Sequence, residues 1–199
     1  MRALIPVATG NEDIELVSLS DVLTRGGIDV ILASVEEERR VRLMQGLCIE
    51  TDCFLADVAD EDFDAIVMAG GIPGALRLSE AAGLRELLIR HHTAGAVIAA
   101  ICLLPALVLE PAGVLEQCPH VTGNSQQIKT GEPTFPPDAF TKLLGPGYDP
   151  QLRVCVDDTQ RIITSQAPGT AIEFALEIVR MLAGDATADS IDRYLMIAR

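Results

Sequence analysis

Short, almost continuous apolar stretches alternate with segments of helical periodicity along the first half of the chain. The apolar stretches cover residues 2–8, 28–35, 63–70 and 96–102. Runs of this length without polar interruption are typical of strands that are covered on both faces, as in a parallel sheet. The pattern therefore predicts four parallel strands joined by right-handed crossovers, with helices on both faces of the sheet.

The intervals between these stretches have apolar residues at helical spacing. Residues 12–24, which a Gly-Gly pair follows as a stop signal, have Ile14, Val17, Leu19, Val22 and Leu23 near helical spacing. In residues 79–92, Ser79 is the expected N-cap and the inner stripe consists of Leu84, Leu87 and Leu88. Both segments are therefore predicted to be amphipathic helices that cover the sheet.

The second half of the chain is less regular. Residues 118–124 favour a further strand, and residues 153–165 predict a hairpin that turns at Asp157 and Asp158. A core helix is expected to follow, with Thr170 as its N-cap, Gly184 as its stop and Ile172, Ala175, Leu176 and Val179 at helical spacing. Residues 129–151 are rich in proline and glycine and too long for an ordinary connection, which favours a surface excursion or lid.

Composition limits the classes of function. A chain of 199 residues with 49% apolar content can bury one core, so we expect a single domain over residues 1–199. The formal net charge of −14 opposes binding to nucleic acid and to anionic membranes. No segment has the length of a signal core or a membrane span, which indicates a cytoplasmic protein.

The five cysteines lack C-x-x-C spacing, so neither a disulfide scaffold nor a metal site is expected. The stretch GGIPG matches neither nucleotide-binding glycine motif, and no cofactor is expected.

The ends of three predicted strands carry the candidate chemistry. They read GNEDIE, AGGIPGA and AICLLP, and regular crossovers bring them to one rim of the sheet. Cys102 lies where a strand passes into a helical pattern, so the helix amides would favour its thiolate and lower its pKa below about 8.5. Packing as a small apolar residue is the alternative. Gly70 and Gly71 could present amides to an oxyanion or could simply form a tight turn.

These motifs, in this order and over nearly the full length, resemble the ThiJ/PfpI family, and within it the protein deglycase branch. The matching segments are RALIPVATGNEDIELVSLSDVLTRGGIDV, FDAIVMAGGIPGALRLSE, VIAAICLLPALVL and ITSQAPGTAIEFALEIVRMLAG. The resemblance implies a flavodoxin-like three-layer α/β sandwich, a nucleophile elbow and a homodimer with Ile14 at its interface. It assigns Cys102 as the nucleophile, Glu15 as the acid that contacts its sulfur, and the backbone of Gly70, Gly71 and Leu103 as the oxyanion pocket.

Two departures from the family pattern concern this site. Asn124 stands where the deglycase branch commonly has a histidine, and Leu103 follows the cysteine where the protease branch has one. A neutral amide cannot serve as a general base, so a cysteine-protease triad is disfavoured. The chain's own histidines, His91, His92 and His120, are expected to be exposed, to complement a helix dipole or to begin a strand. A carboxyl group beside a thiolate is expected to have a raised pKa, because like charges disfavour double ionisation.

Three functions follow from this reading. The first is a cofactor-independent glyoxalase or deglycase-like activity on small α-oxoaldehydes, in which Cys102 adds to the aldehyde and Glu15 moves the proton. The second is a redox sensor or redox-regulated chaperone, in which oxidation of Cys102 is the signal. The third is a thiol hydrolase or amidotransferase-like enzyme, which requires a histidine from a partner subunit or from residues 129–151.

Overall fold

A mostly parallel sheet of seven strands forms the centre of the computed structural model, which describes residues 1–123 and 139–197. The strand order is β5-β2-β1-β6-β7-β9-β8, and only β8 runs antiparallel to its neighbour. The strands are β1 (Arg2–Val7), β2 (Asp29–Ser34), β5 (Cys53–Phe54), β6 (Ala65–Met68), β7 (Val97–Ile101), β8 (Val154–Asp157) and β9 (Ile162–Ser165). The four predicted parallel strands are confirmed, and so is the hairpin.

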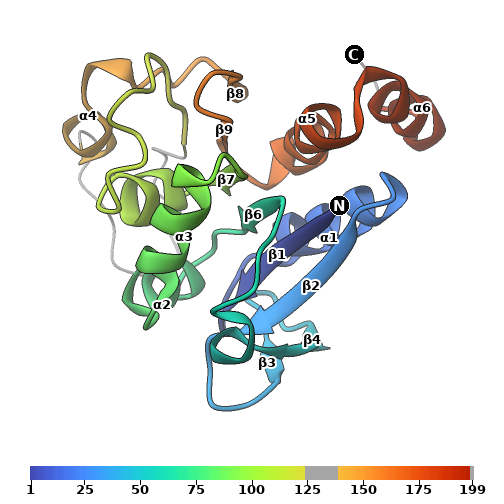
Figure 1. Cartoon of the computed structure of the whole chain (residues 1–199), viewed down its shortest axis with the longest axis vertical. Coiled ribbons are helices and arrows are strands. Elements are labelled where there is room, and N and C mark those ends of the chain that lie inside the picture. The colour runs from blue at the N-terminus through green and yellow to red at the C-terminus, as the bar shows by residue number, and fades with distance from the viewer. Residues whose placement is uncertain (124–138, 198–199) are drawn as a thin grey trace.

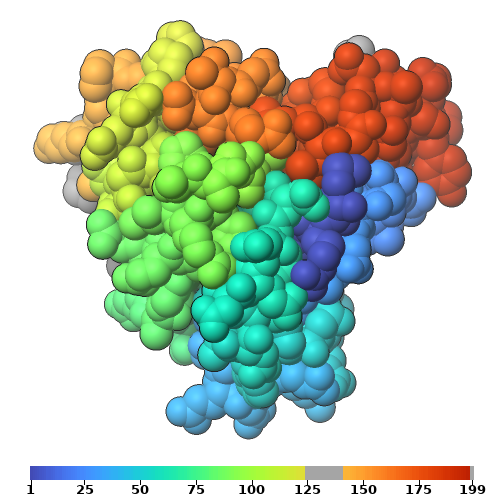
Figure 2. All heavy atoms as spheres, in the orientation of Figure 1, coloured from blue at the N-terminus to red at the C-terminus, as the bar shows by residue number. Residues whose placement is uncertain are grey.

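Helices cover both faces of this sheet, as the sequence predicts (Figure 1). The helices α1 (Asp13–Arg25), α5 (Ala171–Ala183) and α6 (Asp185–Leu195) lie on one side, and α2 (Gly74–Glu80) and α3 (Leu84–Thr93) lie on the other. The dark blue N-terminal residues lie beside the red C-terminal helices in Figure 2. Met1 lines a hollow together with Met181 and Leu182 of α5. The arrangement is a three-layer, flavodoxin-like α/β sandwich.

The remaining elements are short. They are the hairpin β3 (Arg40–Arg42) with β4 (Cys48–Glu50), the 3-10 turns Leu55–Val58, Gly145–Gly147 and Pro168–Thr170, the π-helical turn Pro105–Leu109, and α4 (Ala139–Leu144). Residues 139–151, the described part of the predicted excursion, therefore contain a helix and a 3-10 turn. In the part of the chain that the structure describes, no helix has the length and apolarity to cross a bilayer.

The expected start of the second helix is wrong. Ser79 lies inside α2, where its hydroxyl donates to the Leu76 carbonyl, and it caps nothing. Pro73 occupies the N-cap position of α2, and Gly83, with φ +79°, separates α2 from α3. Glycine adopts this left-handed conformation at little cost, so the chain turns there and a second helix begins at Leu84. Leu84, Leu87 and Leu88 are buried as expected.

Three apolar residues of the predicted helices lie outside the buried stripes. Ile14 and Val17 are exposed on α1, because its buried stripe consists of Glu15, Leu16, Leu19, Val22 and Leu23. Ile172 is exposed on α5, whose buried residues are Ala171, Phe174, Ala175, Leu176, Ile178 and Val179. Helical spacing alone therefore does not say which apolar residues a helix buries.

The segment 118–124 forms no regular strand over its described residues. Val121 makes an isolated bridge to Tyr148, and the Thr122 N–H donates to the hydroxyl of Thr164 on β9 at 3.0 Å. Thr170 does precede α5, but its hydroxyl contacts Ser165 and Ala167 and does not cap the helix. The side chains of Thr164 and Ser165 at the end of β9 thus bind the neighbouring loops in addition to the regular strand pairing.

Candidate active site around Cys102

Cys102 occupies a strained turn directly after β7. Its backbone has φ +67°, a left-handed conformation that is uncommon outside glycine, and its N–H donates to the Ser165 carbonyl at the end of β9. Its side chain is only 6% exposed. This is the geometry of a nucleophile elbow, as the resemblance implies.

The element after Cys102 differs from the expected α-helix. Residues Pro105–Leu109 form a π-helical turn, in which the Glu110 N–H donates to the Pro105 carbonyl. Pro105 has no N–H with which to close an α-helical bond to the carbonyl of Ile101. The Leu107 N–H nevertheless donates to the Leu103 carbonyl, which is an α-helical bond, so the helical segment begins directly after Cys102 and becomes π-helical from Pro105.

Glu15 reaches the sulfur from the first turn of α1. Its side chain is fully buried, its Oε2 accepts a hydrogen bond of 2.7 Å from the Gly70 N–H, and it hydrogen-bonds the Cys102 side chain. Burial raises the pKa of Glu15 to about 8, and the negative charge of Glu12 adds to this, while the bonds to Gly70 and Cys102 lower it. The expected direction is confirmed, but its main cause is desolvation and not repulsion from a thiolate.

A carboxyl group with this pKa carries a proton at neutral pH. It can donate a hydrogen bond to a thiolate, and its loss of the proton is within reach of ordinary pH. Its Oε1 is buried and has no hydrogen-bond partner among the described residues. Glu15 and Cys102 together therefore provide a nucleophile and a proton carrier in direct contact.

The two glycines of the loop after β6 make different contacts. The Gly70 N–H donates to the Glu15 Oε2, and the place of the Gly70 backbone in an oxyanion pocket stays a prediction. The lack of a side chain at Gly70 also lets the loop after β6 lie close to Cys102, because a Cβ at Gly70 would lie 2.6 Å from the Cys102 Cβ. The N–H groups of Gly71 and Leu103 make no hydrogen bond to a described residue, so these two amides remain available.

Asn11 is a positioning residue that the sequence analysis missed. It is fully buried; its Oδ1 accepts from the Ala8 N–H at 2.6 Å, and its Nδ2 donates to the carbonyls of Ala69 and Gly70 at 2.7 and 2.9 Å. The side chain thus joins the end of β1 to the end of β6 and fixes the loop that contacts Glu15. Its place between Gly10 and the N-cap Glu12 was the available signal.

The other predicted residues do not meet at this rim. Asn124 lies outside the described residues. His91 is buried and not exposed: its Nε2 accepts from the Phe63 N–H, just before β6, and its Nδ1 bonds the Leu87 carbonyl. Because β6 and β7 run parallel, Phe63 lies at the opposite end of the sheet from Cys102. His91 is therefore a structural residue.

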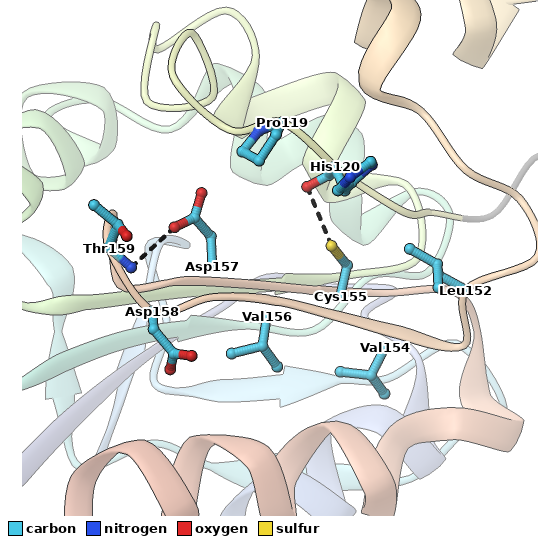
Figure 3. A pocket seen from close by; sticks show the side chains of 9 residues that line it. All are labelled: Pro119, His120, Leu152, Val154, Cys155, Val156, Asp157, Asp158 and Thr159. Atoms are coloured by element: carbon cyan, nitrogen blue, oxygen red, sulfur yellow. Dashed lines mark hydrogen bonds between the residues drawn. The ribbon is translucent and has the colours of Figure 1, made fainter.

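A second cysteine lines a hollow of about 420 Å³ along β8, shown in Figure 3. Its lining residues are Pro119, His120, Leu152, Val154, Cys155, Val156, Asp157, Asp158 and Thr159. The Cys155 thiol donates to the His120 carbonyl at 3.1 Å, and burial, followed by the charges of Asp157 and Asp149, raises its pKa. Burial and Asp157 likewise raise the pKa of Cys118 to about 12. Both thiols remain protonated near neutral pH.

The described residues contain no group of three or more histidine, cysteine or acidic side chains arranged to hold a metal ion. The direct contact between Cys102 and Glu15 supports covalent addition by a thiol with proton transfer by an adjacent carboxyl.

Known proteins share this sequence and fold. Residues 1–181 match the DJ-1/PfpI family. DJ-1 homolog A of Arabidopsis thaliana is 36% identical over 98% of this chain and 46% of its own length, and DJ-1 homolog B is matched over 41% of its length. The chain thus spans less than half the length of these two relatives.

Two further matches extend over nearly the whole of both chains. A Caenorhabditis elegans protein named glutathione-independent glyoxalase DJR-1.2 is 35% identical over 94% of this chain and 91% of its own. The structure of oxidized DJ-1 from Toxoplasma gondii superimposes with a TM-score of 0.85 at 35% identity, covering 100% of this chain and 99% of the other.

Proposed function

Because this chain belongs to the DJ-1/PfpI family, we propose that it is a cofactor-independent, cysteine-dependent glyoxalase or deglycase-like enzyme for small α-oxoaldehydes such as methylglyoxal. The observation that carries the proposal is the contact between Cys102 and the buried, protonated Glu15. The relative named a glutathione-independent glyoxalase supports the same class of reaction.

The reaction begins with addition of the Cys102 sulfur to the aldehyde carbon. The resulting alkoxide takes the proton of Glu15 and gives a hemithioacetal, with the amides of Gly71 and Leu103 binding the oxygen. The Glu15 carboxylate then removes the proton from the former aldehyde carbon, which gives an enediolate, and returns it to the neighbouring carbon. The hydroxyl proton of the adduct passes to the neighbouring oxygen at the same stage, and the product is a thioester of the 2-hydroxy acid. Water cleaves the thioester, so methylglyoxal plus water yields lactate and the free thiol.

Lactate formation from methylglyoxal without glutathione tests this proposal. We expect Cys102→Ala to abolish turnover and Glu15→Gln to lower kcat by about 100-fold or more, the usual scale of general acid–base catalysis. Cys155→Ala is the matched control and should retain activity, because that thiol lies along β8 and its partner is a backbone carbonyl. A Cys102→Ala variant as fast as the wild type would refute the mechanism.

Oxidation sensing is the second candidate, including a redox-regulated chaperone role. The strained backbone of Cys102 and its hydrogen bond to Glu15 favour it, since a protonated carboxyl can also stabilise a sulfinate. Two equivalents of peroxide would convert the thiolate into sulfinate and release two waters. Peptide mapping after mild peroxide treatment should place two added oxygens on Cys102, and an unmodified Cys102 with oxidation elsewhere would count against this function.

A homodimer is the proposed assembly. Ile14, at 57% exposure, and Ile172, at 38%, line one hollow of about 410 Å³ together with Ile197. An exposed apolar surface of this kind suits a self-complementary interface. Analytical ultracentrifugation should show a dimer for the wild type and a monomer for Ile14→Arg, while Val156→Lys, an exposed apolar position on β8, should leave the dimer intact. A monomeric wild type would exclude the assembly.

A further inference from the structure

Glu12 is a buried carboxylate that the proposed mechanism does not use. It is 8% exposed and occupies the N-cap of α1, three residues before Glu15. Glutamate is not among the preferred N-cap residues, but here its carboxylate accepts the N-cap hydrogen bond from the Glu15 N–H, so capping and contact with the Cys102 site coincide in one residue.

Three hydrogen bonds join Glu12, Gly70 and Glu15 in a closed ring. The Glu12 N–H donates to the Gly70 carbonyl at 2.9 Å, the Gly70 N–H donates to the Glu15 Oε2 at 2.7 Å, and the Glu15 N–H donates to the Glu12 Oε2 at 2.8 Å. Glu12 therefore fixes both the backbone of Glu15 and the loop that binds its carboxyl.

The charges around this ring are few. Among the described residues, Glu15 faces Glu12 on its own helix and Cys102 on the elbow, while Glu12 faces Asp13 and Glu15. Burial is the main cause that opposes ionisation of Glu15, and the negative charge of Glu12 also opposes it. The Gly70 N–H and the Cys102 side chain favour ionisation. Removal of the Glu12 charge leaves only burial to hold the proton.

We propose that Glu12 is a positioning residue for the Cys102 site: its carboxylate holds Glu15 against Gly70 and the sulfur, and its negative charge keeps the proton on Glu15. The inference rests on the proposed role of Glu15 as proton carrier, but not on turnover of any substrate. Glu12 contributes no atom to the reaction and acts through Glu15.

The test is a direct titration of the Glu15 carboxyl by ¹³C NMR in glutamate-labelled protein, with Glu15→Gln used to assign the resonance. Glu12→Gln keeps an oxygen that accepts from the Glu15 N–H but removes the charge. We expect its Glu15 midpoint to fall by about one pH unit, the scale of a nearby charge. Asp21→Asn, which removes an exposed charge from the same helix, should leave the midpoint unchanged.

Glu12→Asp keeps the charge and should retain a midpoint closer to that of the wild type than to that of Glu12→Gln. A folded Glu12→Gln variant with the wild-type midpoint would overturn the proposal, as would an equal shift in Asp21→Asn. The titration needs no aldehyde, so the proposal survives if the protein makes no lactate. Conversely, lactate formation together with an unmoved midpoint would leave the proposed function standing and remove the role of Glu12.

Discussion

Two cysteine-bearing regions of one sheet have opposite chemistry. At the elbow, Cys102 follows β7 and hydrogen-bonds a buried carboxyl that holds a proton at neutral pH. At the edge hairpin, formed by β8 and β9, Cys155 donates to a backbone carbonyl, and Asp157 lies close to both Cys155 and Cys118. Both regions bury sulfur next to acidic residues. At the elbow the acid is buried and its pKa is raised to about 8, whereas at the edge hairpin the negative charge of Asp157 raises the pKa of both thiols.

That difference decides what each sulfur can do. A carboxylate beside a thiol repels the thiolate, whereas a protonated carboxyl donates to it. Because Glu15 is buried and protonated, it stabilises the thiolate of the neighbouring cysteine, whereas an ionised carboxylate in its place would destabilise that thiolate. The aspartates of the edge hairpin are not buried as Glu15 is, since the hairpin ends in an exposed turn at Asp158 and Thr159. Its thiols serve packing and hydrogen bonding.

The largest expected contrast is the rate of thiol alkylation. A thiol with a pKa of about 12 is ionised to roughly one part in 10⁵ at neutral pH, so Cys118 should react with iodoacetamide extremely slowly. We expect Cys102 to react at least about 10³-fold faster than Cys118 or Cys155. Time-resolved peptide mapping under native conditions measures each site separately. Equal rates at the three sites would remove the distinction between the regions.

The sequence predicted the parts of this contrast that depend on local pattern. Apolar runs gave β1, β2, β6 and β7, because strands covered on both faces need continuous apolar sequence. The elbow position of Cys102 followed from the strand-to-turn junction and from the family resemblance. The sequence did not show which apolar residues each helix buries, since Ile14 and Ile172 are apolar and near the buried stripes of their helices, yet they are exposed.

Contacts between distant loops were beyond prediction. The Asn11 bonds to Ala69 and Gly70 span almost 60 residues, and nothing in the sequence near Asn11 names its partners. The use of the Gly70 N–H by Glu15 likewise depends on how closely α1 approaches the β6 loop. The π-helical turn Pro105–Leu109 was also not predicted, because the sequence analysis expected an α-helix after Cys102.

Glu15 should make the free energy of unfolding fall as the pH rises. We expect no such effect from the exposed carboxylates of the edge hairpin. Its pKa is about 8 in the folded protein and about 4.5 in an unfolded chain, so the folded state holds a proton that the unfolded state releases. The stabilisation is fully present below about pH 4.5 and is lost as the pH rises through about 8. Glu15→Gln removes this dependence.

We therefore expect Glu15→Gln to gain up to about 4 kcal/mol of unfolding free energy relative to wild type between about pH 5 and pH 9. Urea denaturation at a series of pH values measures the gain, with Asp21→Asn as the control for a change of charge on the same helix. The gain would accompany a loss of turnover, as expected where a functional group is held in an unfavourable environment. Parallel curves for the two variants would contradict the raised pKa.

Asn11→Ala tests the rigidity of the loops that support the elbow. The substitution leaves the Ala8 N–H and the carbonyls of Ala69 and Gly70 without their partner in a buried place, and we expect a loss of about 3 kcal/mol. Asp157→Ala is the matched change at the edge hairpin, where Oδ1 accepts from the Thr159 and Gln160 N–H groups in an exposed turn, and should lower stability by only about 1 kcal/mol. Chemical denaturation compares the two. Similar losses would mean that the rim is no more tightly fixed than the hairpin.

The smallest expected effect concerns Cys155 itself. If its thiol serves only as a hydrogen-bond donor to the His120 carbonyl, then Cys155→Ser, which keeps a donor, should change stability by about 0.5 kcal/mol or less, and Cys155→Ala should cost about 1 kcal/mol. At the elbow, Cys102→Ser and Cys102→Ala should both abolish turnover, whatever the stability of each variant. The serine variant fails because a hydroxyl next to Glu15 is a far weaker nucleophile than a thiolate. Thermal unfolding and lactate assays on the four variants separate a sulfur that is needed for its hydrogen bond from one that is needed for its reactivity. A Cys155→Ser variant with wild-type stability but lost turnover would show that the edge hairpin takes part in the chemistry.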